Sequence, residues 1–186
     1  MKTAITGGIG SGKSYVCRLL EQRGVEIYDC DAAAKRLMRH SEELKQRLQA
    51  LVGEDVYTDG QLNKAVMAQY LLASEANAKA VDGVVHPAVA DDFIRSGMTW
   101  MECAILFESG FHHLVDRVVC VVAPLEVRIR RVMNRDGISR EKVLEWMQRQ
   151  WPQEEVIRRS DFCIVNDGEK DLEKQIDFLI NIKLNE

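Results

Sequence analysis

The chain has 186 residues, of which 46% are hydrophobic and 29% charged, and its formal net charge is −4 at pH 7. This composition excludes a disordered chain and a fibre, and the length is that of one domain of ordinary size. Its acidic balance and short apolar runs predict no nucleic-acid partner and no membrane partner, so we expect a cytoplasmic protein. The five cysteines are widely spaced without a CxxC pair, which favours reduced thiols over disulfides or a zinc site.

The first elements in chain order are a strand, a glycine-rich turn and a helix. Residues 2–6 form a short apolar and β-branched run, and residues 13–22 have apolar side chains at helical spacing. A second strand is predicted at residues 25–28. This alternation is typical of a parallel sheet whose strands are joined by helices.

The turn after the first strand fits the phosphate-binding pattern G-x-x-x-x-G-K-[S/T] in full. Glycines let several backbone N–H groups surround a phosphate, and the helix N-terminus adds partial positive charge. Lys13 would reach the phosphates and the Ser14 hydroxyl would bind Mg²⁺. The nucleotide-binding residues expected here are Gly8, Ile9, Gly10, Ser11, Gly12, Lys13, Ser14 and Tyr15.

Such a loop is shared by GTPase switches, ATP-driven machines and small-molecule kinases. The only Asn-Lys pair, Asn63-Lys64, is followed by Ala65 and Val66 rather than by the guanine-reading N-K-x-D pattern, and the chain is short for a motor. Asp29 and Asp31 follow the second strand, at the sheet edge where α/β proteins bind ligands. One of them could orient an acceptor hydroxyl, although capping of the next helix explains either residue equally well.

Residues 31–97 have leucines at helical spacing with no convincing strand, which predicts a helical insert. After it the chain returns to the alternating pattern, and we expect strands at 98–107, 117–123 and 162–165, helices at 125–134 and 140–150, and a terminal helix. Between Arg128 and Arg159 nine basic residues stand against five acidic ones. This excess is typical of a mobile lid whose arginines close over phosphates, although a solvated helix face accounts for many of the charges.

Taken together, these residues resemble the dephospho-CoA kinase family over nearly the whole chain. The matching motifs are the loop Thr6–Lys13, Asp29-Cys30-Asp31, Asp82 before His86-Pro87, Ile105-Leu106-Phe107-Glu108, Arg135-Asp136-Gly137, Gln150, and Asp161 to Asn166. The resemblance implies an α/β fold, a P-loop kinase with a parallel sheet and flanking helices in a single domain. It would comprise a core (about 1–31, 98–127 and 160–186), a helical acceptor-binding insert (about 32–97) and a lid region (about 128–159).

The resemblance also implies an activity and a set of roles. The activity is ATP- and Mg²⁺-dependent phosphorylation of the ribose 3′-hydroxyl of dephospho-CoA, which gives CoA and ADP in the last step of CoA synthesis. Asp31 would act as the base, Thr6, Asp31 and His86 would meet the acceptor, and Asn166 and Gly168 would lie against adenine. Lys13, Arg131 and Arg135 would neutralise phosphate charge.

Some points stay open on the sequence alone. Glu102 is a candidate second magnesium ligand, with Asp31 or water as alternatives. Another nucleoside kinase and a nucleotide-gated binding protein remain competing interpretations, and the chain is expected to be a monomer or a small homo-oligomer.

Overall fold

The computed structural model of the chain describes residues 1–184. Two compact units are present. One combines Met1–Tyr28 with the chain from Met98 onward, and the other is Asp29–Gly97. No helix within residues 1–184 is both long and apolar enough to cross a membrane.

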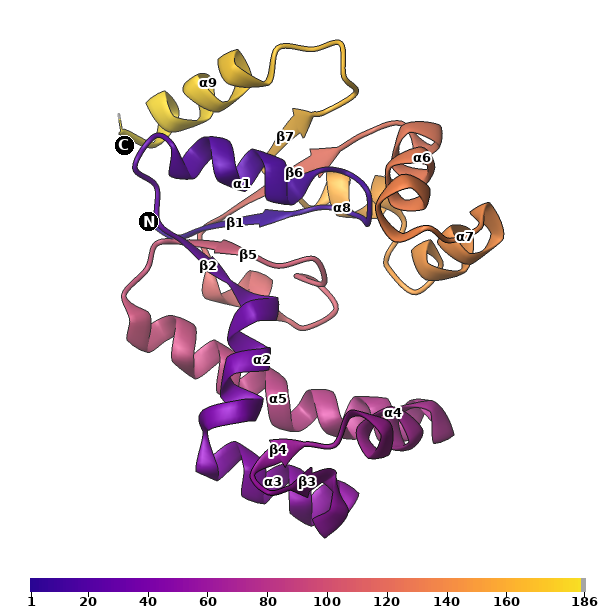
Figure 1. The fold of residues 1–186 in the computed structure, drawn as a ribbon. Helices are drawn as coiled ribbons and strands as arrows, with labels where there is room; N and C mark the ends of the chain where they lie inside the picture. Colours follow the sequence, from indigo (N-terminus) through magenta and orange to yellow (C-terminus); the bar gives the residue numbers. More distant parts are fainter. Residues whose placement is uncertain (185–186) are drawn as a thin grey trace. The chain divides into compact units, whose positions relative to one another are not determined.

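The first unit is built on a five-stranded sheet with the strand order β2-β5-β1-β6-β7. The strands are β1 (Thr3–Thr6), β2 (Ile27–Asp29), β5 (Trp100–Glu102), β6 (Arg117–Val122) and β7 (Phe162–Val165). β1 pairs in parallel with β5 and β6, and β6 pairs in parallel with β7. The central position of β1 places the glycine-rich turn in the middle of the carboxyl edge of the sheet (Figure 1).

Helices α1 (Lys13–Glu21) and α9 (Leu172–Leu184) lie side by side on one face of this sheet (Figure 1). Their apolar faces join the sheet in one core, because Val16 and Leu20 from α1 and Ile176 from α9 pack with Ile5 and other buried strand residues. The helical spacing of these residues in the sequence therefore places their side chains in the core.

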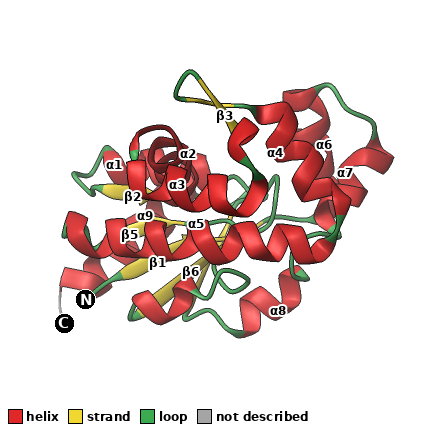
Figure 2. Cartoon of the chain, turned by 90° about the horizontal axis from the view of Figure 1, so that it is seen from below, coloured by secondary structure: helices red, strands yellow, loops and turns green. Residues whose placement is uncertain are grey.

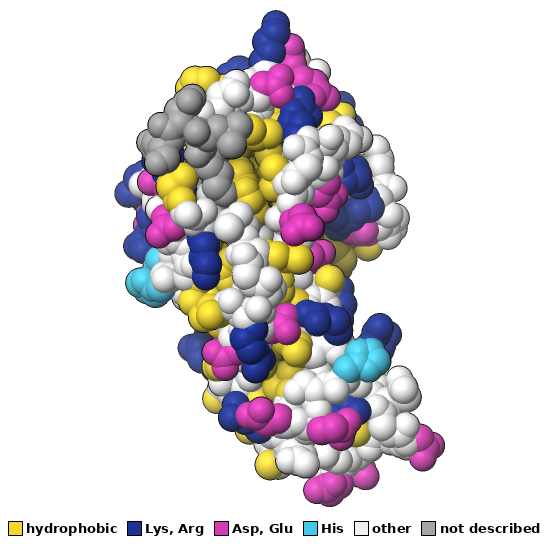
Figure 3. All heavy atoms as spheres, turned by 90° about the vertical axis from the view of Figure 1, so that its left-hand side faces the viewer, with side chains coloured by type: hydrophobic (Ala, Val, Ile, Leu, Met, Phe, Trp, Pro, Cys, Tyr) yellow, Lys and Arg dark blue, Asp and Glu magenta, His cyan; other side chains and the backbone are white. Residues whose placement is uncertain are grey.

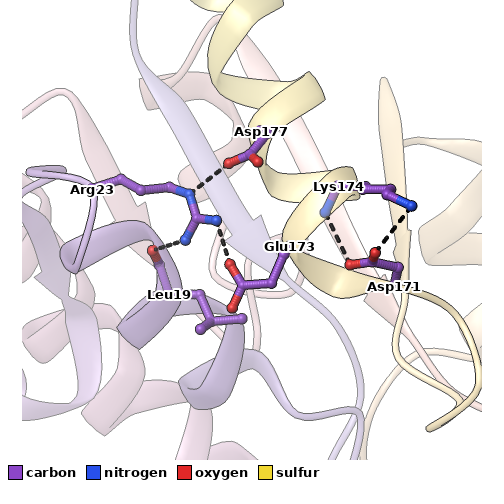
Figure 4. Close-up of polar contacts among 6 residues, drawn as sticks. All are labelled: Leu19, Arg23, Asp171, Glu173, Lys174 and Asp177. Carbon is purple, nitrogen blue, oxygen red and sulfur yellow. Dashed lines mark hydrogen bonds and ion pairs between the residues drawn. The ribbon is translucent and has the colours of Figure 1, made fainter.

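A polar contact fastens α9 to the end of α1 (Figure 4). Arg23 donates from Nε to Asp177 at 2.7 Å and from Nη1 to the Leu19 carbonyl at 2.9 Å, and its guanidinium also pairs with Glu173. Lys174, in the first turn of α9, contacts Asp171, the residue just before the helix, at 3.4 Å.

The region expected to be a lid belongs to the first unit. It contains α6 (Leu125–Asp136), α7 (Arg140–Met147) and α8 (Gln153–Arg158). α6 ends because Gly137 takes a φ of +65°, and Ser139 then caps α7 by accepting from Lys142 N. The prediction of helix to residue 150 was wrong by three residues, since Arg149 and Gln150 donate to carbonyls only three residues back, in a turn ahead of Pro152.

The strand predicted at 98–107 is confirmed only for its first part. Cys103 still donates to Ile5 O, but the chain then turns, with Ser109 N bonded to Ile105 O. Leu106 and Phe107 are buried in this turn and not in a strand. A short apolar run indicates burial without specifying the backbone that achieves it, which explains the error.

The second unit is mainly helical, with α2 (Cys30–His40), α3 (Glu42–Val52), a 3₁₀ turn (Glu54–Val56), α4 (Lys64–Ala73) and α5 (Glu75–Ser96). The expectation that it holds no strand was wrong, because β3 (Tyr57–Thr58) and β4 (Gln61–Leu62) form an antiparallel hairpin just before α4 (Figure 2). Asp59 and Gly60 have φ values of +50° and +74°, as a two-residue Asp-Gly hairpin turn requires.

Candidate functional site

The glycine-rich turn runs directly from β1 into α1 and is enclosed by other parts of the first unit. Gly10 and Gly12 have φ values of +79° and +93°. A Cβ on Gly10 would lie 2.5 Å from the Arg128 carbonyl oxygen, and one on Gly12 would lie 2.1 Å from Asn166 Nδ2. Both positions therefore require glycine. As at the start of any helix, the first N–H groups of α1 have no intrahelical acceptor.

Lys13 is the cation of this loop. Its Nζ donates to the Gly7 carbonyl at 2.7 Å, so the side chain lies back over its own loop. Removal from water lowers the pKa of Lys13, while the nearby Glu102 carboxylate acts in the opposite direction. An incoming phosphate oxygen could replace the Gly7 carbonyl and would stabilise the ammonium.

The donor set of the loop fits Mg²⁺. Within residues 1–184 no group of three His, Cys, Asp or Glu side chains could hold a metal. Mg²⁺ bound to a nucleotide needs only one or two protein oxygens, the rest being phosphate and water. The exposed Ser14 hydroxyl, and the Glu102 carboxylate close enough to act on Lys13, are oxygens of this kind.

Gln150 and Arg128 hold the loop at Ile9, and we name them with Gln153 the Ile9 clamp. Gln150 Oε1 accepts from Ile9 N at 2.8 Å, while Arg128 Nε donates to Ile9 O at 2.9 Å. Arg128 also donates from Nη1 to Gln153 Oε1 at 3.3 Å. Both polar backbone groups of Ile9 are thus engaged by residues more than a hundred positions away in the chain.

Arg128 contacts the glycine-rich loop, a position that the sequence did not predict. Its side chain is buried, with 7% of the residue exposed, and burial lowers its pKa, although an arginine stays protonated. No carboxylate in residues 1–184 forms an ion pair with it. In the sequence Arg128 is one of nine basic residues between positions 128 and 159. Its burial distinguishes it from the others, and the sequence does not show burial.

The structure separates the two lid arginines that the sequence predicted. Arg131 donates to Ser11 O at 3.3 Å and to Asn166 Oδ1 at 3.2 Å. Arg135 instead makes two bonds to its neighbour Asp136, at 2.8 and 2.7 Å, and lowers the pKa of that carboxyl group. Arg131 therefore lies at the phosphate loop, and Arg135 points to a local partner.

Asn166 also contacts the loop, since its Nδ2 donates to Ser11 O at 2.9 Å and its side chain is buried. Gly168 lies two residues further along, with a φ of +93°. Thr6 is buried at the end of β1, and Tyr15 is exposed in the first turn of α1. Asn166 and Arg131 are thus brought to the loop at Ser11 from distant parts of the chain.

Trp151 anchors the segment that carries the clamp. Its ring stacks on Phe107 with centroids 5.6 Å apart, and Arg159 lies 4.8 Å from its centroid. Its backbone N donates to Glu108 Oε1 at 3.0 Å. Phe107 and Glu108, which belong to a motif of the sequence resemblance, therefore hold Trp151, the residue next to Gln150 of the Ile9 clamp.

The two aspartates after β2 have different surroundings. Asp29 caps α2 by accepting from Ala32 N at 2.9 Å, as the capping interpretation predicts. Asp31 lies one residue inside α2, where its largely exposed carboxylate pairs with Lys35 at 2.5 Å. Asp29 is thus engaged in the helix cap, whereas Asp31 pairs with a side chain one turn further along α2.

His86 lies inside α5 and not in a loop, with Pro87 accommodated in the same helix. Its Nε2 is 3.5 Å from Asp82 Oδ1, one turn earlier. The acidic residue and the histidine of the sequence motif are therefore neighbours on one helix face.

Comparison with known proteins adds the family. The family model for dephospho-CoA kinase matches residues 1–171. A dephospho-CoA kinase of Bacteroides fragilis is 43% identical, with 95% of this chain and 89% of the relative covered. A solved Thermus thermophilus structure has a TM-score of 0.80 at 34% identity, covering 100% of this chain and 96% of its own. Shikimate kinase from Acinetobacter baumannii, at 14% identity and a TM-score of 0.54 over 99% and 93% of the two chains, shares the fold.

Proposed function

The chain belongs to the dephospho-CoA kinase family, and from this premise we propose that it transfers the γ-phosphoryl group of ATP to the ribose 3′-hydroxyl of dephospho-CoA, forming CoA and ADP. The observation that carries the proposal is an intact phosphate loop on the central strand in a chain whose match to the family extends over 171 residues. The products complete CoA synthesis.

The phosphate loop supplies electrostatic stabilisation of the transferring group. The N–H groups at the start of α1 and the Lys13 ammonium surround the phosphates, and Arg131 adds a second cation beside Ser11. Ser14, with Glu102 as the second oxygen ligand, would hold Mg²⁺, which would neutralise phosphate charge. The Ile9 clamp holds the loop through both polar backbone groups of Ile9.

Asp31 orients the acceptor hydroxyl and takes its proton. In a loose transition state the proton leaves late, so the carboxylate acts mainly by positioning the attacking oxygen. His86, oriented by Asp82, contacts the acceptor, and Thr6 supports the site from the end of β1. Adenine lies against the Asn166–Gly168 loop, and Arg135 contributes once it leaves Asp136. We infer that the enzyme acts in the cytoplasm, where ATP is available.

The test is ADP release with ATP, Mg²⁺ and dephospho-CoA, compared with the same mixture without acceptor and with adenosine or AMP. We expect ADP only with dephospho-CoA, with an equal amount of CoA. ADP formed only with another acceptor would make the chain a different nucleoside kinase. If no acceptor stimulates release, a nucleotide-gated binding protein replaces this proposal.

A further inference from the structure

The second unit contains a cavity of about 300 Å³ that none of the roles above uses. It lies between α2, the hairpin strand β4 and the first residue of α4. Its lining consists of Lys35, Met38, Arg39, Gln61, Leu62 and Lys64. Three of these six side chains are cations and none is acidic, and we name this site the cationic pocket.

The cationic pocket departs from the charge of its surroundings. Residues 29–97 contain eleven acidic and eight basic residues, so the unit as a whole is acidic. On the face drawn in Figure 3, basic and acidic side chains are interspersed. Three cations around one cavity repel one another, and Arg39 indeed lowers the pKa of Lys35, against the stronger opposite effect of Asp31. A bound anion would relieve this repulsion.

The ion pairs of the unit point to the same cavity. Five of its eight lysines and arginines pair with carboxylates of the unit. Arg39, Lys64 and Arg95 have no ion-pair or hydrogen-bond partner in the part of the chain that the structure describes. Two of these three cations line the cationic pocket, and the third pocket cation, Lys35, is held by Asp31 at 2.5 Å.

The pocket wall has a fixed shape. Tyr57 OH donates to the Met38 carbonyl at 2.8 Å, which ties the hairpin to α2. Tyr57 in turn pairs with Leu62 across the hairpin, and the Asp-Gly turn fixes that register. Leu62 and Met38 therefore form an apolar wall next to the cations, which suits a ligand that joins an anionic group to a carbon chain.

We propose that the cationic pocket binds the diphosphate of the acceptor, with Met38 and Leu62 against the first carbons of its pantetheine arm. The inference rests on the proposed function, because the 3′-hydroxyl and the diphosphate are attached to the same ribose. At ~1.5 Å per residue, Lys35 lies ~6 Å and Arg39 ~12 Å along α2 from Asp31. A hydroxyl at Asp31 therefore places the diphosphate along the Lys35 and Arg39 face of the helix.

Lys35 links the pocket to the proposed base. Its ammonium pairs with the Asp31 carboxylate. A diphosphate in the cationic pocket competes for this ammonium and leaves the Asp31 carboxylate available to the acceptor hydroxyl. Binding of the correct acceptor thus prepares the base, whereas a nucleoside without a diphosphate leaves the Lys35–Asp31 pair closed.

The test uses the double variant Arg39→Gln with Lys64→Gln, and Arg95→Gln as the matched control, because Arg95 is also an unpaired cation of this unit but lies outside the pocket. Calorimetry on the full chain, with the phosphate loop first saturated with ADP, gives Kd for dephospho-CoA and for inorganic diphosphate. We expect both ligands to bind on the order of tenfold more weakly to the double variant, with the control unchanged. Equal Kd values in the double variant and the control would overturn the assignment.

Two further measurements separate this inference from the proposed function. Adenosine lacks the diphosphate, so its Kd should be the same for wild type and double variant; an equal loss for adenosine would show general damage to the unit and would contradict the pocket. CoA formation by the wild type tests the reaction itself. If no CoA forms but diphosphate binding depends on Arg39 and Lys64, the reaction is wrong and the pocket stands as an anion site.

Discussion

The phosphate loop and the cationic pocket both offer positive groups to an anion, but they are constructed differently. The loop is held through its backbone, because Ile9 and Ser11 are bonded by Gln150, Arg128 and Asn166. The pocket presents exposed ends of long side chains, two of which have no partner within residues 1–184. Donors fixed in the backbone can bind a transition state more tightly than a ground state. Cations at the ends of long side chains add affinity but do not fix the orientation of the ligand. The loop is therefore suited to chemistry and the pocket to recognition.

The largest effect is expected for a variant of the phosphate loop. Lys13→Ala removes the cation proposed to bind the phosphates, and its effect should be greatest in the transition state, so kcat for CoA formation should fall by on the order of a hundredfold or more. The measurement is steady-state turnover, with circular dichroism to confirm folding. Turnover near that of the wild type would reject the phosphate role of Lys13.

Asp31→Asn tests the proposed base, which lies in the second unit. The amide keeps the shape of the carboxylate but cannot take the proton, so kcat should fall far more than the affinity for ATP. Turnover and Kd for ATP are measured on the same preparation. An equal loss of ATP binding would indicate that Asp31 is a magnesium ligand.

Gln150→Leu tests whether the Ile9 clamp maintains the shape of the phosphate loop. The variant removes the acceptor of the Ile9 N–H and leaves that donor without its partner, so kcat/KM for ATP should fall by on the order of tenfold. Gln148→Leu is the matched control, because Gln148 is exposed in the same turn and its side chain forms no hydrogen bond to the loop within residues 1–184.

The Gln150 variant also distinguishes the phosphate loop from the cationic pocket. If the loop is held by the Ile9 clamp, the loss appears for ATP and leaves Kd for dephospho-CoA unchanged. Identical kinetics in the Gln150 and Gln148 variants would mean that the loop keeps its shape without the clamp.

The smallest effect is expected at Arg23, which lies in neither site. Arg23→Gln removes the contacts to Glu173 and Asp177, but all three side chains are at the surface, so Tm should fall by only about 1–3 °C. Thermal unfolding at low and high salt is the measurement. Kinetic constants should stay at wild-type values. A change in Kd for ATP or for dephospho-CoA would show that α9 influences the phosphate loop or the cationic pocket.

Local patterns in the sequence were sufficient for much of the fold. The strand, glycine-rich turn and helix at residues 3–21, the strand at 162–165 and the helical insert all follow from periodicity and motif, because neighbouring residues determine such elements. The Asp59-Gly60 hairpin had a signal as well, since Asp-Gly is a favoured two-residue turn, but its strands are only two residues long. The end of β5 had no local signal, because Leu106 and Phe107 are buried in a turn as completely as they would be in a strand.

The sequence by itself determined the phosphate-binding motif, the parallel α/β class, and the resemblance through which Asp31 became the candidate base. Only the tertiary structure showed that Arg128 and Gln150 bind Ile9, that Arg131 reaches the loop while Arg135 pairs with Asp136, and that three cations share a pocket. The reason is physical. A motif lies in neighbouring residues, whereas the contacts to Ile9 join residues up to 141 positions apart, and burial and ion pairing depend on how the whole chain packs.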